Sequence, residues 1–457
     1  MSSKKSKSIS RRGFVTTSAT AIAGLTIVPN RAVSGLGHTA PSDKLNVAAI
    51  GIGGKGASNI AAVAKTENIV ALCDVDWHGP VDKIFKIYPN ANRYKDFRVM
   101  LDKQKDIDGV LIATPDHTHA IITLESMKRG KHVYTEKPLT HSVQEARILT
   151  RAAKKYKVAT QMGNSGQAGD GPRRLREMIW DGAIGPVREV HSWVDRPNNG
   201  YFKTYWPQGV DRPKDTPPVP STLDWDLFLG PSPERPYSPE YHPFKWRGWW
   251  DFGNGSLGDM GCHLFDPVFR ALKLKYPVSV QAVSTLVNKE SYPLGSMVLF
   301  EFPAREGMPP VTLKWYDGGL RPFVISELEE GMSMMKSDRG TLYIGDKGKI
   351  LENTILPKSL RGSYKNPEPY IPSSPGHYME WIMACKGGEP AGSNFEWAGP
   401  LTEAVLLGNI ALRPELREKL SSQPLLYDEQ KGIFTNISEA NQFLELEYRE
   451  GWELVLD

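Results

Sequence analysis

The chain has 457 residues, of which 40% are apolar and 24% charged, a composition typical of a soluble globular protein. At roughly 100 to 200 residues per domain, this length predicts two or three domains. The formal charge of +4 would suit an anionic partner, but the first forty residues hold six of the 56 Lys and Arg and no acid. The other 50 face 52 Asp and Glu, so we expect no nucleic-acid binding.

The first forty residues predict an export signal and a linker. Arg11 and Arg12 follow a cationic start, and an uncharged stretch then runs from Gly13 to Pro29. This order is typical of a twin-arginine signal, which predicts the twin-arginine export machinery as a partner and a periplasmic location. The stretch is short and weakly apolar for a membrane span of about 20 residues, although an uncleaved signal would anchor the protein to the membrane.

An apolar run, a glycine-rich turn and a helix-forming segment come next. Residues 45–50 predict a strand, and residues 57–64 predict a helix. We assign the glycines between them to cofactor binding, namely Gly51, Gly53, Gly54 and Gly56. Gly51 permits a tight turn, Gly53 lets backbone amides approach a pyrophosphate, and Gly56 lets the helix pack closely on the strand.

A second apolar run, residues 69–73, ends in Asp74. A carboxylate at this position can accept hydrogen bonds from both ribose hydroxyls of adenosine, and it would repel the 2′-phosphate of NADP. Because no Arg or Lys follows immediately, the sequence predicts NAD as the cofactor. The alternative is that Asp74 only caps a helix or lies in a solvated turn.

Strand and helix patterns alternate through residue 134, which predicts a doubly wound parallel sheet. One strand ends at Thr114 and Pro115, which we place on the nicotinamide side of the cleft. His117 and His119 could resemble metal ligands, but nothing in the sequence completes a set, so we expect no metal site. His119 is assigned to the cofactor cleft, with capping of the next helix as an alternative. The three cysteines show no C-x-x-C spacing and predict free thiols.

Together with Glu136-Lys137-Pro138, these features resemble the Gfo/Idh/MocA family, which comprises glucose–fructose oxidoreductase, inositol dehydrogenases and many sugar dehydrogenases. Residues 255–266 resemble the second motif of that family, in which an Asp precedes the active-site His by four positions. The resemblance implies an α/β protein. An NAD-binding Rossmann domain with a parallel sheet would span residues 41–162, and a substrate-binding domain with a large, mostly antiparallel sheet would span residues 163–415. It also implies that Glu136 and Lys137 contact the cofactor.

A helix that begins near Ser256 would place Asp259 and His263 on one face. Oxidation of a secondary alcohol needs a base for the hydroxyl proton, and His263 suits that role with an ordinary pKa near ~6.5. The resemblance places Lys137 between nicotinamide and substrate, where it would stabilise a developing alkoxide. Asp259 would orient His263 or bind a neighbouring hydroxyl. The alternative is that both residues only form a capped helix start.

Beyond residue 162 the pattern changes to strand-like runs, at residues 187–194, 278–284, 297–302 and 311–315, and a hairpin at residues 342–351. They predict a largely antiparallel sheet, and the resemblance implies that this sheet supports a homo-oligomer. Asn164 opens this domain and is assigned to substrate binding. Helix-like segments at 377–386 and 398–412 would return to the cofactor domain, and residues 416–457 form a C-terminal extension.

A long loop insertion, residues 198–252, is rich in Pro, Gly and aromatic residues. Loops of this length tend to be functional, and aromatic faces stack well on sugar rings. We assign Trp249 to substrate binding, with His191 from outside the insertion, and Arg247 could hydrogen-bond substrate hydroxyls. The alternative is that these aromatic residues pack the insertion against the sheet.

Three functions are compatible with this sequence. The first is an NAD-dependent oxidoreductase that transfers hydride from a secondary hydroxyl of a sugar, glycoside or cyclitol, with Lys137 and His263 in acid–base roles. The second is an NAD-dependent glycoside hydrolase that uses a redox-neutral cycle of oxidation and elimination. The third is a non-catalytic sugar-binding relative, which the presence of Lys137, Asp259 and His263 disfavours.

Overall fold

The computed structural model describes residues 43–200, 203–334 and 337–456. The predicted export signal and linker, residues 1–40, lie outside these ranges. No helix within them is long and apolar enough to cross a membrane. All of the described strands and helices belong to one unit that begins at Leu45.

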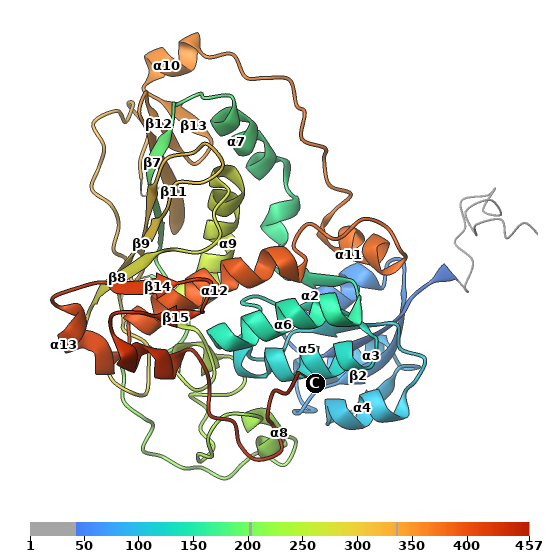
Figure 1. The fold of residues 1–457 in the computed structure, drawn as a ribbon. Coiled ribbons are helices and arrows are strands. Elements are labelled where there is room, and N and C mark those ends of the chain that lie inside the picture. Colours follow the sequence, from blue (N-terminus) through green and yellow to red (C-terminus); the bar gives the residue numbers. More distant parts are fainter. Residues whose placement is uncertain (1–42, 201–202, 335–336, 457) are drawn as a thin grey trace, which may run out of the picture. The chain divides into compact units, whose positions relative to one another are not determined.

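The first part of this unit contains a six-stranded parallel sheet with the strand order β3-β2-β1-β4-β5-β6 (Figure 1). Its strands are β1 (Asn46–Ile50), β2 (Asn68–Cys73), β3 (Asn92–Tyr94), β4 (Gly109–Ile112), β5 (His132–Thr135) and β6 (Thr160–Met162). The helices between them are α2 (Lys55–Val63), α3 (Pro80–Ile87), α4 (Phe97–Lys103), α5 (Asp116–Lys128) and α6 (Val143–Tyr156). The doubly wound sheet predicted from the alternating pattern is confirmed.

Both faces of this sheet are buried, because neighbouring residues of a strand point to opposite sides. Val47 and Ala49 belong to a core with residues of α2, α3 and a later helix, α11 (His377–Cys385). Ala48 and Ile50 belong to a larger core that includes residues of α5 and α6. The continuous apolar run of β1 follows from this double coverage.

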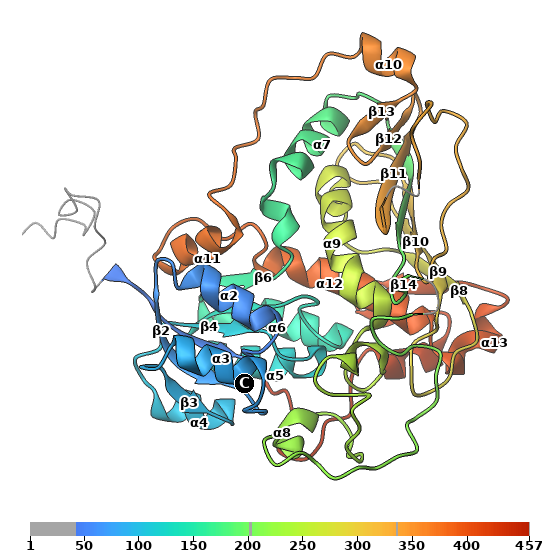
Figure 2. The same ribbon diagram turned by 180° about the vertical axis from the view of Figure 1, so that it is seen from behind.

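The second part contains a nine-stranded sheet with the order β13-β12-β11-β7-β10-β9-β8-β14-β15 (Figure 2). Its strands are β7 (Val187–Val194), β8 (Ser279–Ser284), β9 (Ser296–Phe302), β10 (Val311–Tyr316), β11 (Arg339–Gly345), β12 (Lys349–Leu351), β13 (Thr354–Leu356), β14 (Leu425–Asp428) and β15 (Ile433–Phe434). Strands β7 and β10 pair in parallel, and the other described pairs are antiparallel. The predicted mostly antiparallel sheet is therefore confirmed.

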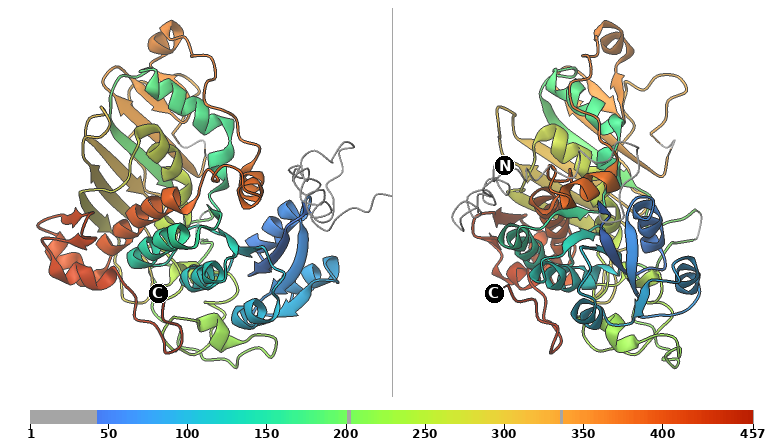
Figure 3. Two further views of the ribbon diagram at one scale, coloured as in Figure 1. Left: turned by 45° about the vertical axis from the view of Figure 1, so that its right-hand side comes forward. Right: turned by 90° about the vertical axis from the view of Figure 1, so that its right-hand side faces the viewer.

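Helices join the two sheets (Figure 3). Helix α9 (Gly255–Leu272) packs on β7, with α7 (Asp170–Trp180) beside it, and α12 (Phe395–Ala411) packs on β8, β9 and α6. Almost every residue of α12 is buried, which explains why its sequence has no polar face. Short elements complete the described chain, namely α8 (Trp225–Leu229), α10 (Lys358–Ser363), α13 (Arg417–Leu420), η3 (Ser165–Ala168), η4 (Lys245–Gly248), η5 (Pro414–Leu416) and η6 (Ser438–Phe443).

The turn between β1 and α2 provides a test of the packing. A Cβ atom at Gly56 would lie 1.9 Å from the carbonyl oxygen of Gly51, whereas nothing lies within 4 Å of a Cβ at Gly54. We expect Gly56→Ala to lower the free energy of unfolding by about 1–3 kcal/mol through overpacking. Gly54→Ala, the matched control, should change it by less than about 0.5 kcal/mol. Urea unfolding of both variants measures the difference, and equal stability would contradict the packing argument.

Candidate functional site

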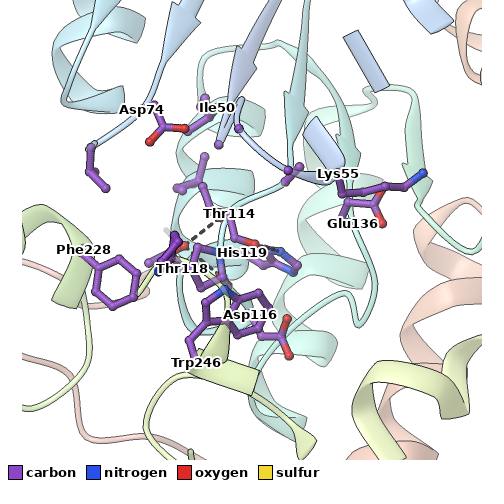
Figure 4. A pocket seen from close by; sticks show the side chains of 18 of the residues that line it. Ile50, Lys55, Asp74, Thr114, Asp116, Thr118, His119, Glu136, Phe228 and Trp246 are labelled. Carbon is purple, nitrogen blue, oxygen red and sulfur yellow. Dashed lines mark hydrogen bonds between the residues drawn. The ribbon is translucent and has the colours of Figure 1, made fainter. Parts of the chain in front are cut away.

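The carboxyl ends of β1, β2, β4 and β5 meet at a cleft with a volume of about 860 Å³. Ligands of doubly wound sheets bind at this edge, outside the strands where the strand order reverses. In Figure 4, Asp74 lies on the opposite side of the cleft from Glu136 and Lys55, and Thr114 lies between them. Most of the predicted cofactor and catalytic residues line this one cleft, including Lys137, Asp259 and His263.

The glycine turn and Asp74 are joined by hydrogen bonds. Gly51, Gly53 and Gly54 line the cleft, whereas Gly56 packs beneath the turn. The backbone N–H groups of Ile52 and Asp76 donate to the carboxylate of Asp74 over 2.8 and 3.1 Å. Burial raises the pKa of Asp74 to about 6, although these N–H groups oppose the shift. Asp74 is therefore mostly ionised at neutral pH and remains able to accept ribose hydroxyls.

The turn after β4 is held against the turn after β5 by His119. Its Nδ1 lies 2.8 Å from the carbonyl oxygen of Pro138, and its Nε2 lies 2.9 Å from that of Thr114. Burial lowers the pKa of His119, so the neutral ring can donate to one of these two oxygens at a time. Thr114, Pro115 and His119, which the sequence assigns to cofactor binding, all line the cleft, and His119 also connects the two turns.

An ion pair connects the parallel-sheet part of the chain to helix α9. The Nζ of Lys137, which follows β5, donates to the backbone oxygen and to Oδ1 of Asp259 over 2.6 and 2.7 Å. The Nε of Arg247, from the insertion, lies 3.4 Å from the same Oδ1. Burial alone would raise the pKa of Asp259, but the charges of Lys137 and Arg247 hold it well below its ordinary value. Two cations thus share one carboxylate in the cleft.

His263 lies one helical turn beyond Asp259 and also lines the cleft. Burial and the charge of Lys137 lower the pKa of His263 to about 3, so its ring is neutral at pH 7. Within the described residues, no hydrogen bond joins the ring to Asp259. The contact by which Asp259 was expected to orient His263 is thus not seen, and the carboxylate of Asp259 contacts Lys137 and Arg247 instead.

Glu136 lines the cleft beside Lys137 and is fixed from two sides. Its Oε1 accepts a hydrogen bond of 2.8 Å from the Nδ2 of Asn59 on α2. A Cβ atom at Gly163 would lie 2.4 Å from its carboxylate, so only a glycine allows this approach. The predicted cofactor-binding Glu136 is therefore held rigidly between α2 and the end of β6.

The residues assigned to substrate binding beside His263 do not line the cleft. Asn164 is buried, where it donates to Asp266 over 2.9 Å and accepts from Ser393. Trp249 is 1% exposed in the core of the insertion, and its Nε1 donates to the backbone oxygen of Glu240. His191 lies on β7, between Tyr316 and Glu189.

Trp249 is therefore better described by the alternative interpretation, in which aromatic residues of the insertion have a packing role and do not bind a substrate. Sequence alone cannot separate the aromatic residues that pack the insertion from those that face a ligand. The structure places Phe244, Trp246 and Arg247 at the cleft instead.

Asp116 is a cleft residue that the sequence analysis missed. It begins α5, is 4% exposed, and accepts a hydrogen bond of 3.0 Å from the Nδ2 of Asn254, which precedes α9. Burial raises the pKa of Asp116 to about 7 in spite of the nearby charges of Lys137 and Arg247. Its position directly after Pro115, at the ligand-binding edge, was a signal that could have indicated it.

Trp452, near the C-terminus, also lines the cleft. No motif or periodicity in the sequence connects this residue to the site, because the contact depends on the path of the whole C-terminal extension. Among the described residues, no group of three or more His, Cys, Asp or Glu side chains is arranged to hold a metal ion.

Two family models match consecutive parts of the chain. The model described as "Oxidoreductase family, NAD-binding Rossmann fold" matches residues 45–164, and "Oxidoreductase family, C-terminal alpha/beta domain" matches residues 173–291. These ranges of 120 and 119 residues are together more than half of the 457 residues. They cover the parallel sheet, Lys137, Asp259 and His263.

Curated relatives of two kinds are similar in sequence. Glycosyl hydrolase family 109 protein 1 of Shewanella sp. (strain MR-4) is 27% identical over 201 residues, which are 39% of this chain and 43% of that protein. Inositol 2-dehydrogenase/D-chiro-inositol 3-dehydrogenase of Lacticaseibacillus casei is 28% identical over 159 residues, 33% of this chain and 46% of that protein. The chain spans about half the length of the curated relatives it matches.

Solved structures share the fold at low identity. The WlbA dehydrogenase from Bordetella pertussis, in complex with NADH and UDP-GlcNAcA, has a TM-score of 0.55 and 17% identity, covering 81% of this chain and 97% of that one. GenD2 from gentamicin A biosynthesis, in complex with NAD, has a TM-score of 0.54 and 17% identity, covering 84% and 97%. At this identity the similarity shows the fold alone.

The pKa of Asp74 leads to a test of its role in NAD binding. Because burial raises that pKa to about 6, the carboxyl becomes protonated below pH 6 and loses its strength as an acceptor. We expect the affinity for NAD to fall by about tenfold per pH unit below pH 6. Asp74→Asn should bind NAD weakly at all pH values and lose this dependence. Calorimetric titration from pH 5 to 8 measures it, with the exposed Asp82→Asn as control. A retained pH dependence in Asp74→Asn would exclude this group as its source.

Proposed function

We propose that this chain, which belongs to the oxidoreductase family with an NAD-binding Rossmann domain and a C-terminal α/β domain, oxidises a secondary hydroxyl of a sugar, glycoside or cyclitol. One observation supports this proposal above all. The Lys137–Asp259 pair and His263 line the same cleft as Asp74 and the glycine turn. Groups suited to alcohol oxidation and groups suited to a dinucleotide thus share one cleft.

The residues of the cleft fit NAD. The N-terminus of α2 follows the glycine turn and offers backbone N–H groups to a pyrophosphate. Asp74 and Asp76 both line the cleft beside that turn. Their carboxylates would repel the 2′-phosphate that NADP carries on its adenosine ribose, so the cleft fits NAD better than NADP. Thr114, Pro115 and Glu136 would hold the nicotinamide half, and bound NAD would accept the hydride that leaves the substrate carbon.

Lys137 provides the electrostatic part of the mechanism. Its ammonium is fixed by two hydrogen bonds to Asp259, so it requires little reorganisation when charge develops on the substrate oxygen. The remaining donor capacity of Nζ can bind the reacting hydroxyl. His263 is neutral at pH 7 and has a ring nitrogen for the hydroxyl proton, but its low pKa makes it a weaker base than the ordinary histidine expected from the sequence. The pair Lys137 and His263 thus divides the work of stabilising charge and accepting a proton.

A second function, the redox-neutral hydrolysis of glycosides, shares these residues. In that reaction oxidation at one ring carbon acidifies its neighbour, elimination expels the leaving group, water adds to the resulting double bond, and reduction restores the first carbon. The similarity to the glycosyl hydrolase family 109 proteins, over 201 residues at 27% identity, favours keeping this candidate. The two functions differ in the fate of the hydride: the dehydrogenase would release it as NADH, whereas the hydrolase would return it to the sugar.

The proposal includes export and assembly. Arg11, Arg12 and the uncharged stretch that follows support transport by the twin-arginine machinery to the periplasm. That route carries folded proteins, which suits a protein that takes up its cofactor in the cytoplasm. The resemblance to sugar dehydrogenases supports a homo-oligomer formed through the nine-stranded sheet.

An assay of NAD-loaded protein tests the catalytic proposal. We add sugars, cyclitols and nitrophenyl glycosides, and record absorbance at 340 nm together with release of the aglycone. NADH without aglycone supports the dehydrogenase, and aglycone without net NADH supports the hydrolase. Lys137→Ala should lower turnover by about 10²- to 10³-fold because the alkoxide loses its stabilising charge. Lys154→Ala, at an exposed position on α6, is the control. Full activity of Lys137→Ala would refute the mechanism.

Cell fractionation tests export and assembly. We expect the protein in the periplasmic fraction, with a mass by light scattering of at least two chains. Replacing Arg11 and Arg12 by Lys should leave it in the cytoplasm, because the pair is the element that the export machinery reads. Unchanged export of that variant would exclude the twin-arginine route, and a monomeric mass would exclude the oligomer.

A further inference from the structure

Arg247 brings a guanidinium group from the insertion to the end of the cleft that holds Lys137, called here the reacting end. It lies on η4, and its Nε is 3.4 Å from Oδ1 of Asp259, the oxygen that also accepts from Lys137 over 2.7 Å. Figure 4 shows the preceding residue, Trp246, well away from Asp74. Because Arg247 and Lys137 contact the same oxygen, one sugar molecule at the reacting end can contact both cations.

Aromatic rings hold the guanidinium group in place. Its central carbon lies 4.1 Å from the ring centre of Trp246 and 4.5 Å from that of Phe244. Its Nη1 also donates to the backbone oxygen of Phe244 over 3.2 Å. Stacking of this kind fixes the plane of a guanidinium, so little conformational entropy remains to be lost when a ligand binds.

The protein leaves part of this guanidinium without a partner. An arginine side chain carries five N–H donors, and among the described residues the bond from Nη1 to Phe244 is the one hydrogen bond that the Arg247 side chain makes. The ion pair of its Nε with Asp259 is longer than the bonds of 2.6 and 2.7 Å that Lys137 makes with that residue. The Arg247 side chain is 21% exposed and lines the cleft, so its remaining donors are available to a ligand.

Two other arginines of the insertion are paired differently. Arg212 donates from Nε and Nη2 to both carboxylate oxygens of Glu290, over 2.9 and 2.8 Å, and Arg235 donates to the carboxylate of Asp251. The pair of Arg212 is the two-pronged arrangement that a planar guanidinium forms with a planar carboxylate. Arg247 has no such pair within the described residues, so a carboxylate that matches it would have to come from a ligand.

The charges at the reacting end also leave room for an anion. Asp259 is the one carboxylate within ion-pair distance of Arg247 among the described residues, and it pairs with Lys137 as well. Burial raises the pKa of Asp116 to about 7, so this nearby carboxyl is only partly ionised at neutral pH. Glu136 accepts a hydrogen bond from α2 and makes no described ion pair with either cation. A ligand carboxylate would therefore meet a net positive charge beside Asp259.

We propose that the substrate is a sugar acid or a glycoside of one, and that Arg247 binds its carboxylate while Lys137 binds the hydroxyl that is oxidised. This proposal names the substrate class of the oxidation proposed above and rests on that function. The carboxylate of a uronic acid is planar and carries one charge, which suits a single guanidinium better than a phosphate dianion does. Hydrogen bonds to a charged acceptor are roughly twice as strong as those between neutral groups, so a neutral sugar would gain less from Arg247.

A purely structural Arg247 would only help to keep Asp259 ionised. Lys137 already makes the two shorter contacts with Asp259, so that role leaves the free donors of Arg247 without a use. The two roles predict different results. Loss of a structural Arg247 would weaken the binding and oxidation of every sugar, whereas loss of a carboxylate-binding Arg247 would affect acidic sugars selectively.

Matched acidic and neutral sugars test this proposal. Full-length protein loaded with NAD is titrated calorimetrically with glucuronate, galacturonate and mannuronate, and with the methyl ester of each, which has nearly the same shape without the charge. We expect at least one uronate to bind about 10- to 100-fold more tightly than its ester, because the ester lacks the charge-assisted hydrogen bonds. Arg247→Gln should remove this preference. Arg247→Lys should keep part of it, since lysine supplies the charge without the planar pair of donors.

The control variant is Lys245→Gln, which removes a neighbouring cation of the insertion. Lys245 pairs with Glu240 and is not among the residues that line the cleft, so this variant should prefer the uronate as strongly as wild type. Thermal unfolding shows whether each variant is folded, and the comparison of uronate with ester on wild-type protein decides the proposal even if Arg247→Gln does not fold.

Several outcomes would refute the carboxylate site. They are equal affinity of wild-type protein for every uronate and its ester, an equal loss of affinity for both in Arg247→Gln, and tighter binding of glucose 6-phosphate or glucose 6-sulfate than of any uronate. Absorbance at 340 nm separates this proposal from the proposed function. Oxidation of neutral sugars without a preference for uronates would leave the oxidoreductase and remove the carboxylate site. Binding of a uronate in preference to its ester, with no sugar oxidised, would do the reverse.

Discussion

The contact between Lys137 and Asp259 is the interaction on which the site depends. Lys137 follows β5 of the parallel sheet, Asp259 lies on α9 against the nine-stranded sheet, and 2.7 Å separate Nζ from Oδ1. Because both side chains are largely buried, neither charge can be left alone without a large desolvation cost. The ammonium group of Lys137 therefore keeps its position only while the two sheets keep their relative position at the cleft. Helix α12 supports that relative position by packing against elements of both sheets.

The insertion depends on the same arrangement and adds to it. Arg247 reaches Asp259 from the insertion, while its guanidinium packs over the ring of Trp246 at 4.1 Å. A Cβ atom at Gly253 would lie 2.5 Å from the Cα of Arg247, so the backbone there is closely packed. The insertion thus places a second cation beside Lys137 at the carboxylate of Asp259. A change that loosens the insertion would disturb both the lining of the cleft and the charge balance around Asp259.

Much of the fold was predictable because its signals are local. Local rules explain three features, namely the apolar run before Gly51, the glycine turn, and a carboxylate at the end of a strand, Asp74. Together with the alternating strands and helices, these features predicted the parallel sheet and the edge at which its ligand binds. Placing Lys137 and Asp259 together required the family resemblance, since 122 residues separate them. Trp249 shows the limit of composition, which cannot tell a packed aromatic residue from one at a cleft. Trp452 reaches the site through tertiary packing that no local pattern records, whereas Asp116 directly follows Pro115 at the ligand-binding edge and could have been predicted.

The charges in the cleft indicate how the proton is handled. Lys137 and Arg247 keep Asp259 ionised, while burial raises the pKa of Asp116 to about 7 and lowers that of His263 to about 3. Environments that push pKa values apart in this way separate the roles of neighbouring groups. In the proposed reaction the ammonium of Lys137, held in place by Asp259, stabilises the alkoxide. The neutral His263 would then take the proton of the substrate hydroxyl, and the negative charge that develops on the substrate oxygen during the transfer would offset the charge of Lys137.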